Sequence, residues 1–206
     1  MFPKLFTIGD FYLPTYGVLV ALAFLIALAI TVRLARRSHL DAEIVTNLAV
    51  YCALAGLAGA KVLMIFFDFD YYRQHPSEIF SLATLQAAGV FQGGLALAII
   101  TAVLYIRHHK LPFLKTADAF SPGIAIGHSI VRLGCFAAGC CWGKACSLPW
   151  AVTFHNLAAN QLVGVPLNVT LHPTQLYELV TDGVVFAFLY WRFGREHRAG
   201  EILGLY

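Results

Sequence analysis

The stretch GHSIVRLGCFAAGCCWGKACSLPWAV, residues 127–152, decides the fold, because an apolar segment with a single arginine runs into a cysteine-rich turn. If the segment begins as a helix, His128, Arg132, Cys135 and Gly139 lie on one face, since they are spaced by four, three and four residues. A charge inside a bilayer costs about 2.5–3.5 kcal/mol on insertion scales, so Arg132 is expected to face protein, water or an anion. Its guanidinium offers a planar fork of donors that matches a phosphate. The alternative is an arginine near a helix end that snorkels to the interface.

The composition is that of a polytopic membrane protein. The chain has 206 residues, of which 59% are hydrophobic and 12% charged, and its mean hydropathy is +0.72. Nucleic acid is not expected as a partner, because the net charge of +3 comes from 14 basic residues scattered along the chain. Asp10 and Pro14 stand at the entry to the first apolar run and no small-residue cleavage site follows it. That run is therefore expected to remain as a membrane span.

Apolar segments of about 20 residues predict the spans. They cover 12–32, 42–67, 87–106, 117–138 and 173–191, and residues 200–206 have the character of the first turns of a sixth. Ser38 or Asp41 is placed to cap the second helix. The sequence thus predicts an all-α, polytopic membrane helix bundle of about five or six transmembrane helices, folded as one domain over residues 1–206, with a long loop at 139–171.

The distribution of basic residues predicts the orientation. Nine lie on one side of the predicted spans and three on the other. The larger group is Arg33, Arg36, Arg37, Arg107, Lys110, Lys115, Arg192, Arg195 and Arg198, and the smaller is Lys4, Arg73 and Lys144. The amino end and the loop 139–171 are therefore expected outside the cytoplasm.

Two motifs resemble one known family. The run RLGCFAAGCCWGK at 132–144, with P-W at 149–150, resembles the signature G-R-I-G-N-F-x-N-G-E-x-[YW]-G-[RK] followed by P-[WF] of the prolipoprotein diacylglyceryl transferases. HPTQLYE at 172–178 resembles their second signature, H-P-[ST]-Q-L-Y-E, without departures. The first signature departs at four positions, where the family has glycine, two asparagines and glutamate. These positions are Val131, Cys135, Ala138 and Cys140.

The resemblance implies a reaction and its partners. In the family, the diacylglyceryl group of phosphatidylglycerol passes to the thiol of a lipobox cysteine in prolipoprotein signal peptides, and glycerol phosphate leaves. It implies a multi-pass protein of the bacterial cytoplasmic (inner) membrane, with membrane lipids as partners and no cofactor. Members also have a further carboxyl-terminal span that bears an arginine and a glutamate. Because both substrates are membrane-bound, the cavity is expected to open sideways to lipid.

Phe91-Gln92-Gly93-Gly94 resembles the family's F-H-G-G, whose histidine is a candidate for the base that activates the thiol. Gln92 cannot accept a proton usefully at neutral pH. It can bond a phosphate or glycerol oxygen, or a neighbouring helix. His128 is the first substitute for the base, followed by His172 or Glu178.

Two further positions resemble family site residues, and each also has a structural interpretation. Tyr16 resembles the tyrosine of a family Y-G pair, and it can equally belong to an interfacial aromatic belt. Lys61 can supply a second cation to the phosphate or snorkel outward. The expected catalytic residues are thus Arg132, Gln92, His128, Tyr16, Cys135 and Cys140. The expected substrate-binding residues are Lys61, Gly93, Gly94, Gly139, Gly143, His172, Gln175, Tyr177 and Glu178.

The cysteines allow three interpretations. Cys135, Cys140, Cys141 and Cys146 form C-x4-C-C-x4-C, and an oxidising exterior favours structural disulfides. Redox or catalytic thiols are the second possibility, and zinc with His128 or His155 is the third. The spacing is not the C-x2-C of common zinc modules, so no metal ligand set is predicted. The alternative functions are a membrane thiol oxidoreductase that uses the outward cysteines, or a non-catalytic lipid- or lipoprotein-binding relative.

Overall fold

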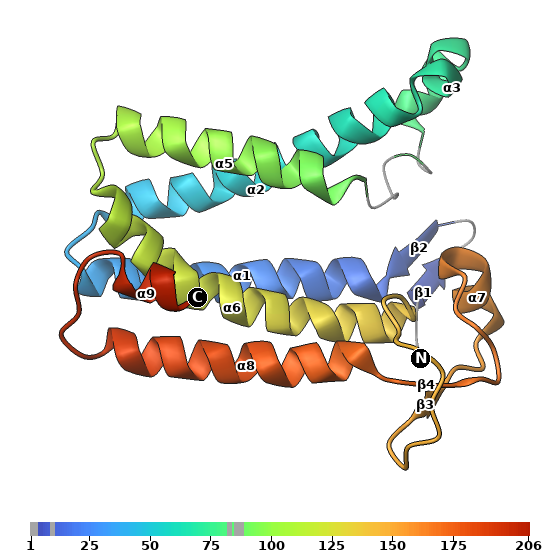
Figure 1. The fold of residues 1–206 in the computed structure, drawn as a ribbon. Helices are drawn as coiled ribbons and strands as arrows, with labels where there is room; N and C mark the ends of the chain where they lie inside the picture. The colour runs from blue at the N-terminus through green and yellow to red at the C-terminus, as the bar shows by residue number, and fades with distance from the viewer. Residues whose placement is uncertain (1–3, 9–10, 82–83, 85–88) are drawn as a thin grey trace. The chain divides into compact units, whose positions relative to one another are not determined.

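The computed structural model describes the chain except residues 1–3, 9–10, 82–83 and 85–88, and it is dominated by helices (Figure 1). The helices are α1 (Thr15–Arg37), α2 (Ala42–Phe67), α3 (Phe69–Gln74), the 3-10 helix η1 (Pro76–Phe80), α5 (Phe91–His108), α6 (Phe113–Ala138), α7 (Leu157–Val163), α8 (Thr174–Phe193) and α9 (Glu201–Leu205). The strands β1 (Lys4–Ile8) and β2 (Phe11–Pro14) form one antiparallel pair, and β3 (Val152–Thr153) and β4 (Thr170–Leu171) form another. The predicted helical fold class is confirmed.

The predicted helix bounds agree with the structure to different degrees. Among the described residues, α1, α2 and α5 are long and apolar enough to cross a membrane. The second predicted span, 42–67, coincides with α2. The prediction that the first helix starts at Tyr12 was wrong, because Tyr12 belongs to β2 and the helix starts at Thr15. In the third predicted span, Ala87 and Ala88 lie outside the described residues, and α5 starts at Phe91.

The chain divides into two compact units, which are described separately. One contains residues 39–116 and the other residues 1–38 and 117–206. In the first, α2 and α5 pack along a seam of glycines. A Cβ atom on Gly59 would lie 2.3 Å from the carbonyl oxygen of Gly93, and one on Gly93 would lie 2.4 Å from that of Gly59. Only residues without a side chain allow backbones to approach so closely. Asp41 caps α2 as predicted, since its Oδ1 accepts from the backbone N–H groups of Glu43 and Ile44.

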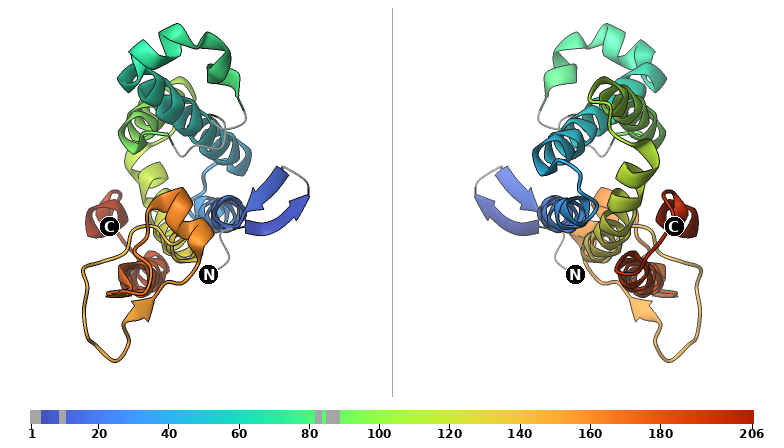
Figure 2. Two further views of the ribbon diagram at one scale, coloured as in Figure 1. Left: turned by 90° about the vertical axis from the view of Figure 1, so that its right-hand side faces the viewer. Right: turned by 90° about the vertical axis from the view of Figure 1, so that its left-hand side faces the viewer.

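In the second unit, α6 lies between α1 and α8, as the side and end-on views both show (Figures 1 and 2). A Cβ atom on Gly123 of α6 would lie 2.1 Å from Oγ1 of Thr31 in α1, so these helices are in close contact. On the other side, the Ser129 hydroxyl donates to the carbonyl of Leu179 in α8 over 2.8 Å. These contacts fix α6, the helix that carries Arg132, against both neighbours.

The predicted loop 139–171 has its own small core. Phe154, Ala159, Val165 and Leu171 are buried together, with Phe136, Trp142 and Val152 packed against them. Within it, α7 is capped by Asn156, whose side chain accepts from the N–H groups of Ala158 and Ala159. The segment is therefore a folded lobe that connects α6 to α8.

A buried carboxylate holds the end of the described chain. Asp118 of α6 is 1% exposed and accepts from the backbone N–H groups of Gly200, over 2.6 Å, and Leu203, over 2.9 Å. Glu201 also forms an ion pair with Arg192. The first turn of α9 is thus fixed against α6.

Candidate active site

The predicted polar stripe on α6 is present. Nη2 of Arg132 lies 3.1 Å from Nε2 of His128, one turn earlier, and must donate because a guanidinium has no acceptor. The carbonyl of Cys135, three residues further, accepts from the N–H groups of Gly139 and Cys140 at the end of the helix. His128, Arg132 and Cys135 thus lie within α6 at the predicted spacing, whereas Gly139, which was predicted to continue the stripe, lies beyond the end of the helix at Ala138.

Two acids on α8 face this stripe. Nη2 of Arg132 lies 2.5 Å from Oε2 of Glu178, and Nδ1 of His128 lies 3.4 Å from Oδ2 of Asp182. His128 and Arg132 are four residues apart on α6, and Glu178 and Asp182 are four residues apart on α8. Each basic residue therefore lies opposite one acidic residue. The Arg132 side chain is 20% exposed and that of Glu178 is 45% exposed. The arginine is thus paired with a carboxylate without being sealed in by it.

Two polar atoms of this group are unused. Within the described residues, Nε of Arg132 and Oδ2 of Asp182 are buried and have no hydrogen-bond partner. A buried donor without a partner costs about 1–3 kcal/mol. An oxyanion bound beside Arg132 would remove that cost, since it can accept from Nε.

The two signature motifs meet in space. The N–H of Gly143 donates to the carbonyl of His172, and the N–H of His172 donates to the carbonyl of Lys144, each over 3.0 Å. A Cβ atom on Gly143 would lie 2.8 Å from side-chain atoms of both His172 and Thr174. Gln175 is fully buried, and its Nε2 donates to the carbonyl of Cys140 over 2.6 Å. The contacts of Gly143 and Gln175 thus hold the turn after α6 onto α8.

Three aromatic residues form an exposed group at the start of α8. Tyr177 lies with its hydroxyl 3.1 Å from Nδ1 of His172, and it accepts from Nε1 of Trp150 over 2.8 Å. His172 and Tyr177 were expected to bind substrate, and the structure brings their side chains together, with Tyr177 directly preceding Glu178.

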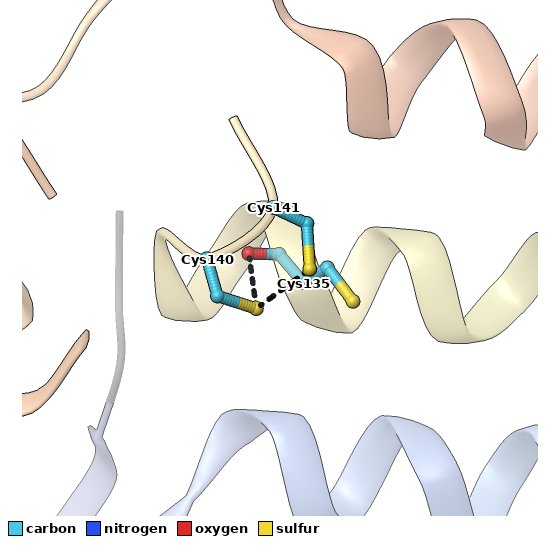
Figure 3. A group of neighbouring side chains, drawn as sticks. All are labelled: Cys135, Cys140 and Cys141. Carbon is cyan, nitrogen blue, oxygen red and sulfur yellow. Dashed lines mark hydrogen bonds between the residues drawn. The ribbon is translucent and has the colours of Figure 1, made fainter. Parts of the chain in front are cut away.

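All five cysteines belong to the part of the chain that the structure describes, and all are free thiols there, without a disulfide. Sγ atoms of Cys135, Cys140 and Cys141 lie within 4.8 Å of one another (Figure 3), and this set is here called the thiol cluster. Contact with the Cys135 side chain, followed by burial, raises the pKa of the Cys140 thiol above its ordinary value. Among the described residues, these soft donors form a group that could hold a metal ion.

Tyr16 lies beside this end of α6. It is 37% exposed, and a Cβ atom on Gly134 would lie 3.1 Å from its Cδ2 atom. The structure therefore places Tyr16 against the helix that carries Arg132 and Cys135, and its role in a site stays a prediction.

The remaining predicted residues belong to the other unit. Nζ of Lys61 donates to the carbonyl of Thr84 over 2.6 Å, and Gln92 is exposed in the first turn of α5. Gly93 and Gly94 face α2 in the glycine seam. Close helix packing accounts for both glycines without a substrate, so their binding role remains a prediction.

Asp182 was missed by the sequence reasoning, which stopped at the end of the HPTQLYE motif. The signal was available, because Glu178 and Asp182 repeat on α8 the four-residue spacing of His128 and Arg132 on α6. A polar pair at that spacing in each of two apolar helices indicates that the helices face each other through those residues.

Comparisons with known proteins extend the family resemblance over the chain. The family described as "Prolipoprotein diacylglyceryl transferase" matches residues 3–206. A phosphatidylglycerol–prolipoprotein diacylglyceryl transferase of Clostridium tetani is 31% identical over 206 residues, which cover all of this chain and 80% of that protein. Proteins of the same name are 30% identical in Finegoldia magna, over 93% of this chain and 72% of the relative, and 34% identical in Vibrio cholerae serotype O1, over 99% and 73%.

Proposed function

The chain belongs to the prolipoprotein diacylglyceryl transferase family, and we propose that it transfers the diacylglyceryl group of phosphatidylglycerol to the lipobox cysteine of prolipoprotein signal peptides. The relatives' names supply phosphatidylglycerol and prolipoprotein as the substrate classes. The observation that carries the proposal is Arg132, a guanidinium on an apolar helix that keeps an unused N–H beside an exposed carboxylate.

Arg132 stabilises the leaving group in this proposal. As the acceptor thiolate attacks the glyceryl carbon, the bond from that carbon to the phosphate oxygen breaks and negative charge grows on the phosphate. A preorganised donor at such a position is typically worth about 2.7–4 kcal/mol. Glu178 is paired with one terminal nitrogen of the Arg132 guanidinium. The phosphate would either bind the remaining N–H groups of Arg132 or displace Glu178.

In this proposal His128 takes the proton from the acceptor thiol. A neutral imidazole with its hydrogen on Nδ1 fits both neighbours, because Nε2 then accepts from Arg132 and Nδ1 directs its hydrogen toward Asp182, although no hydrogen bond is formed to Oδ2, which lies 3.4 Å away. This tautomer is assigned from the partners. A phosphate that draws Arg132 toward itself would free the Nε2 lone pair, so that headgroup binding and base activation are coupled.

Headgroup-binding roles for Gln92 and Lys61 rest on their family positions alone. Gln92 is exposed and can donate to a glycerol or phosphate oxygen, but it cannot replace the base. Lys61 carries a charge that favours an anion close by. Their family positions support these roles.

The three apolar helices and the family support a membrane location. We propose the cytoplasmic membrane with the amino end outside, on the distribution of basic residues. Single cysteines introduced at exposed positions test this, in a chain whose five native cysteines are replaced by serine because Cys141 is itself exposed. A membrane-impermeant maleimide should label Leu162→Cys in intact cells, and should label Glu196→Cys only after lysis. The opposite pattern would reverse the orientation.

The direct test is lipid transfer to a lipobox peptide in phosphatidylglycerol vesicles, read by mass spectrometry as a diacylglyceryl adduct. Arg132→Ala should abolish the adduct, and Arg132→Lys should keep only a small part of the rate, because a lysine keeps the charge but not the fork. Arg195→Ala is the matched control, since this arginine stacks on Trp191, 4.1 Å from the ring centroid, away from the site.

Two outcomes would contradict transfer. If wild-type protein forms no adduct but oxidises a dithiol peptide, and variants of Cys140 and Cys141 lose that oxidation while Arg132→Ala keeps it, thiol redox chemistry explains the protein better. If wild-type protein binds the vesicles and never modifies the peptide, the chain is a non-catalytic relative.

A further inference from the structure

The thiol cluster is formed by the turn that ends α6. Helix α6 stops at Ala138, and Gly139 and Cys141 adopt left-handed φ angles of +82° and +62°. That conformation costs a non-glycine residue such as Cys141 about 1–2 kcal/mol. The turn folds the chain back so that Cys140 and Cys141 lie beside Cys135 (Figure 3).

Contacts from α8 hold this turn in place. Gln175 donates to the carbonyl of Cys140 and Thr174 donates to the carbonyl of Cys141, each over 2.6 Å. Both donors come from the first turn of α8. The backbone that carries two of the three thiols is therefore fixed from outside the cluster, which is how ligand sets are preorganised.

The spacing of the sulfur atoms matches a metal site. A tetrahedral zinc ion with bonds of ~2.3 Å to sulfur sets its sulfur ligands about 3.8 Å apart. Sγ of Cys140 lies 3.7 Å from Sγ of Cys141, and the whole set lies within 4.8 Å. A disulfide would use two of these sulfurs and leave the third unused. The linear spacing predicted no metal ligand set, because it does not show how the turn folds back.

We propose that Cys135, Cys140 and Cys141 bind a zinc-class divalent cation through three thiolates, and that the open fourth position receives the thiol of the acceptor cysteine. Three protein ligands with one open position are the pattern of catalytic zinc sites. Cys141 is exposed while Cys135 is buried, so the open position faces outward. The site carries one net negative charge with three thiolates, and Arg132 lies one turn before Cys135 to offset it.

The second half of this proposal rests on the proposed transferase function and deepens it. A thiol that coordinates zinc gives up its proton outright. The acceptor thiol would release its proton to water or to His128 as the metal–sulfur bond forms. Its sulfur then attacks the glyceryl carbon, a C–S bond forms, the C–O bond to phosphate breaks, and the phosphate oxygen keeps the electron pair. No oxidant or reductant is consumed. Coordination of the acceptor thiol would deprotonate it without a general base at position 92, where the chain has Gln92.

Metal binding is tested first, without activity. The full chain is purified in detergent with reductant, dialysed against Zn²⁺ and analysed by inductively coupled plasma mass spectrometry. We expect about one zinc ion per chain. Cys135→Ser and Cys141→Ser should each reduce bound zinc below about one tenth of an equivalent. Cys146→Ser and Cys52→Ser are matched controls, since both thiols lie outside the cluster, and both should keep the metal.

Three results would overturn the metal site. Equal zinc content in Cys141→Ser and wild type would exclude it, and Cys141 is exposed, so this variant should fold. Wild-type protein without zinc would do the same, as would a disulfide within the cluster found in protein purified without reductant. Thermal unfolding of every variant separates loss of the site from loss of the fold.

The fourth ligand is tested with Co²⁺ in place of zinc, because cobalt thiolate sites absorb visible light. A lipobox peptide should change the spectrum, and the same peptide with serine for its cysteine should not. An unchanged spectrum with both peptides would refute the acceptor-thiol assignment. Arg132→Ala separates this inference from the proposed function, since it should keep the metal and the peptide-induced change while losing lipid transfer.

Discussion

Replacing Gly59 by alanine is expected to destabilise the pairing of α2 with α5. The new Cβ atom would lie 2.3 Å from the carbonyl oxygen of Gly93 and 2.7 Å from Cβ of Leu97. Carbon–oxygen contacts normally begin near 3.3 Å, so the helices must separate by about 1 Å. One obstacle is backbone and cannot rotate away, which places the cost near the upper end of the 1–3 kcal/mol typical of overpacking, or about 3 kcal/mol.

Gly56→Ala is the matched control for this change. It adds the same methyl group to the same helix, but the nearest atom to its Cβ, the carbonyl oxygen of Gly94, lies at 3.7 Å, an ordinary contact. Both variants gain the same helix propensity, about 1 kcal/mol over glycine. The difference between them therefore isolates the clash.

The assay is thermal unfolding of both variants in the same detergent, followed by circular dichroism. A loss of about 3 kcal/mol corresponds to roughly a hundredfold change in the unfolding equilibrium. At about 2–4 °C per kcal/mol for a chain of this size, Gly59→Ala should unfold roughly 6–12 °C below Gly56→Ala. Equal unfolding temperatures would show that the glycine seam is not as tight as described.

Three further predictions concern other parts of the molecule. Asp182→Ala should lower kcat for lipid transfer roughly tenfold or more with little change in KM, because it removes the carboxylate that faces Nδ1 of His128; an equal rise in KM would instead indicate a role in binding. Asp118→Ala should cost about 1–3 kcal/mol in thermal unfolding, since two partly buried N–H groups of the α9 turn lose their acceptor, and Asp118→Asn, which keeps an acceptor oxygen, should cost less. The hydrogen bond to Glu78 raises the pKa of Tyr71, so the folded protein holds that phenol proton to higher pH, and Glu78→Gln should lower the pH at which this tyrosine ionises in an ultraviolet titration; an unchanged midpoint would refute the contact.

Local patterns predicted the helices well, because their signals lie within a few residues. Asp41 caps α2, and residues 42–67 form that helix as predicted. The face shared by His128 and Arg132 also followed from helical periodicity alone. These features depend on neighbours in the sequence.

Features that depend on distant contacts were not predicted. The lobe after α6 forms because Phe154 and Leu171 meet in a shared core, and no local pattern shows that meeting. The thiol cluster depends on the left-handed turn at Cys141, a residue type that rarely adopts it. Asp182 acquires its place only when α8 packs on α6.

The fit of Gly143 against His172 and Thr174 has a consequence for exchanging parts between relatives. The two signature motifs are interlocked at this point, because no space remains for even one methyl group. A chimera that imports the first motif from a relative with a bulkier residue there should misfold unless the second motif comes with it. The two signature motifs should therefore be exchanged together.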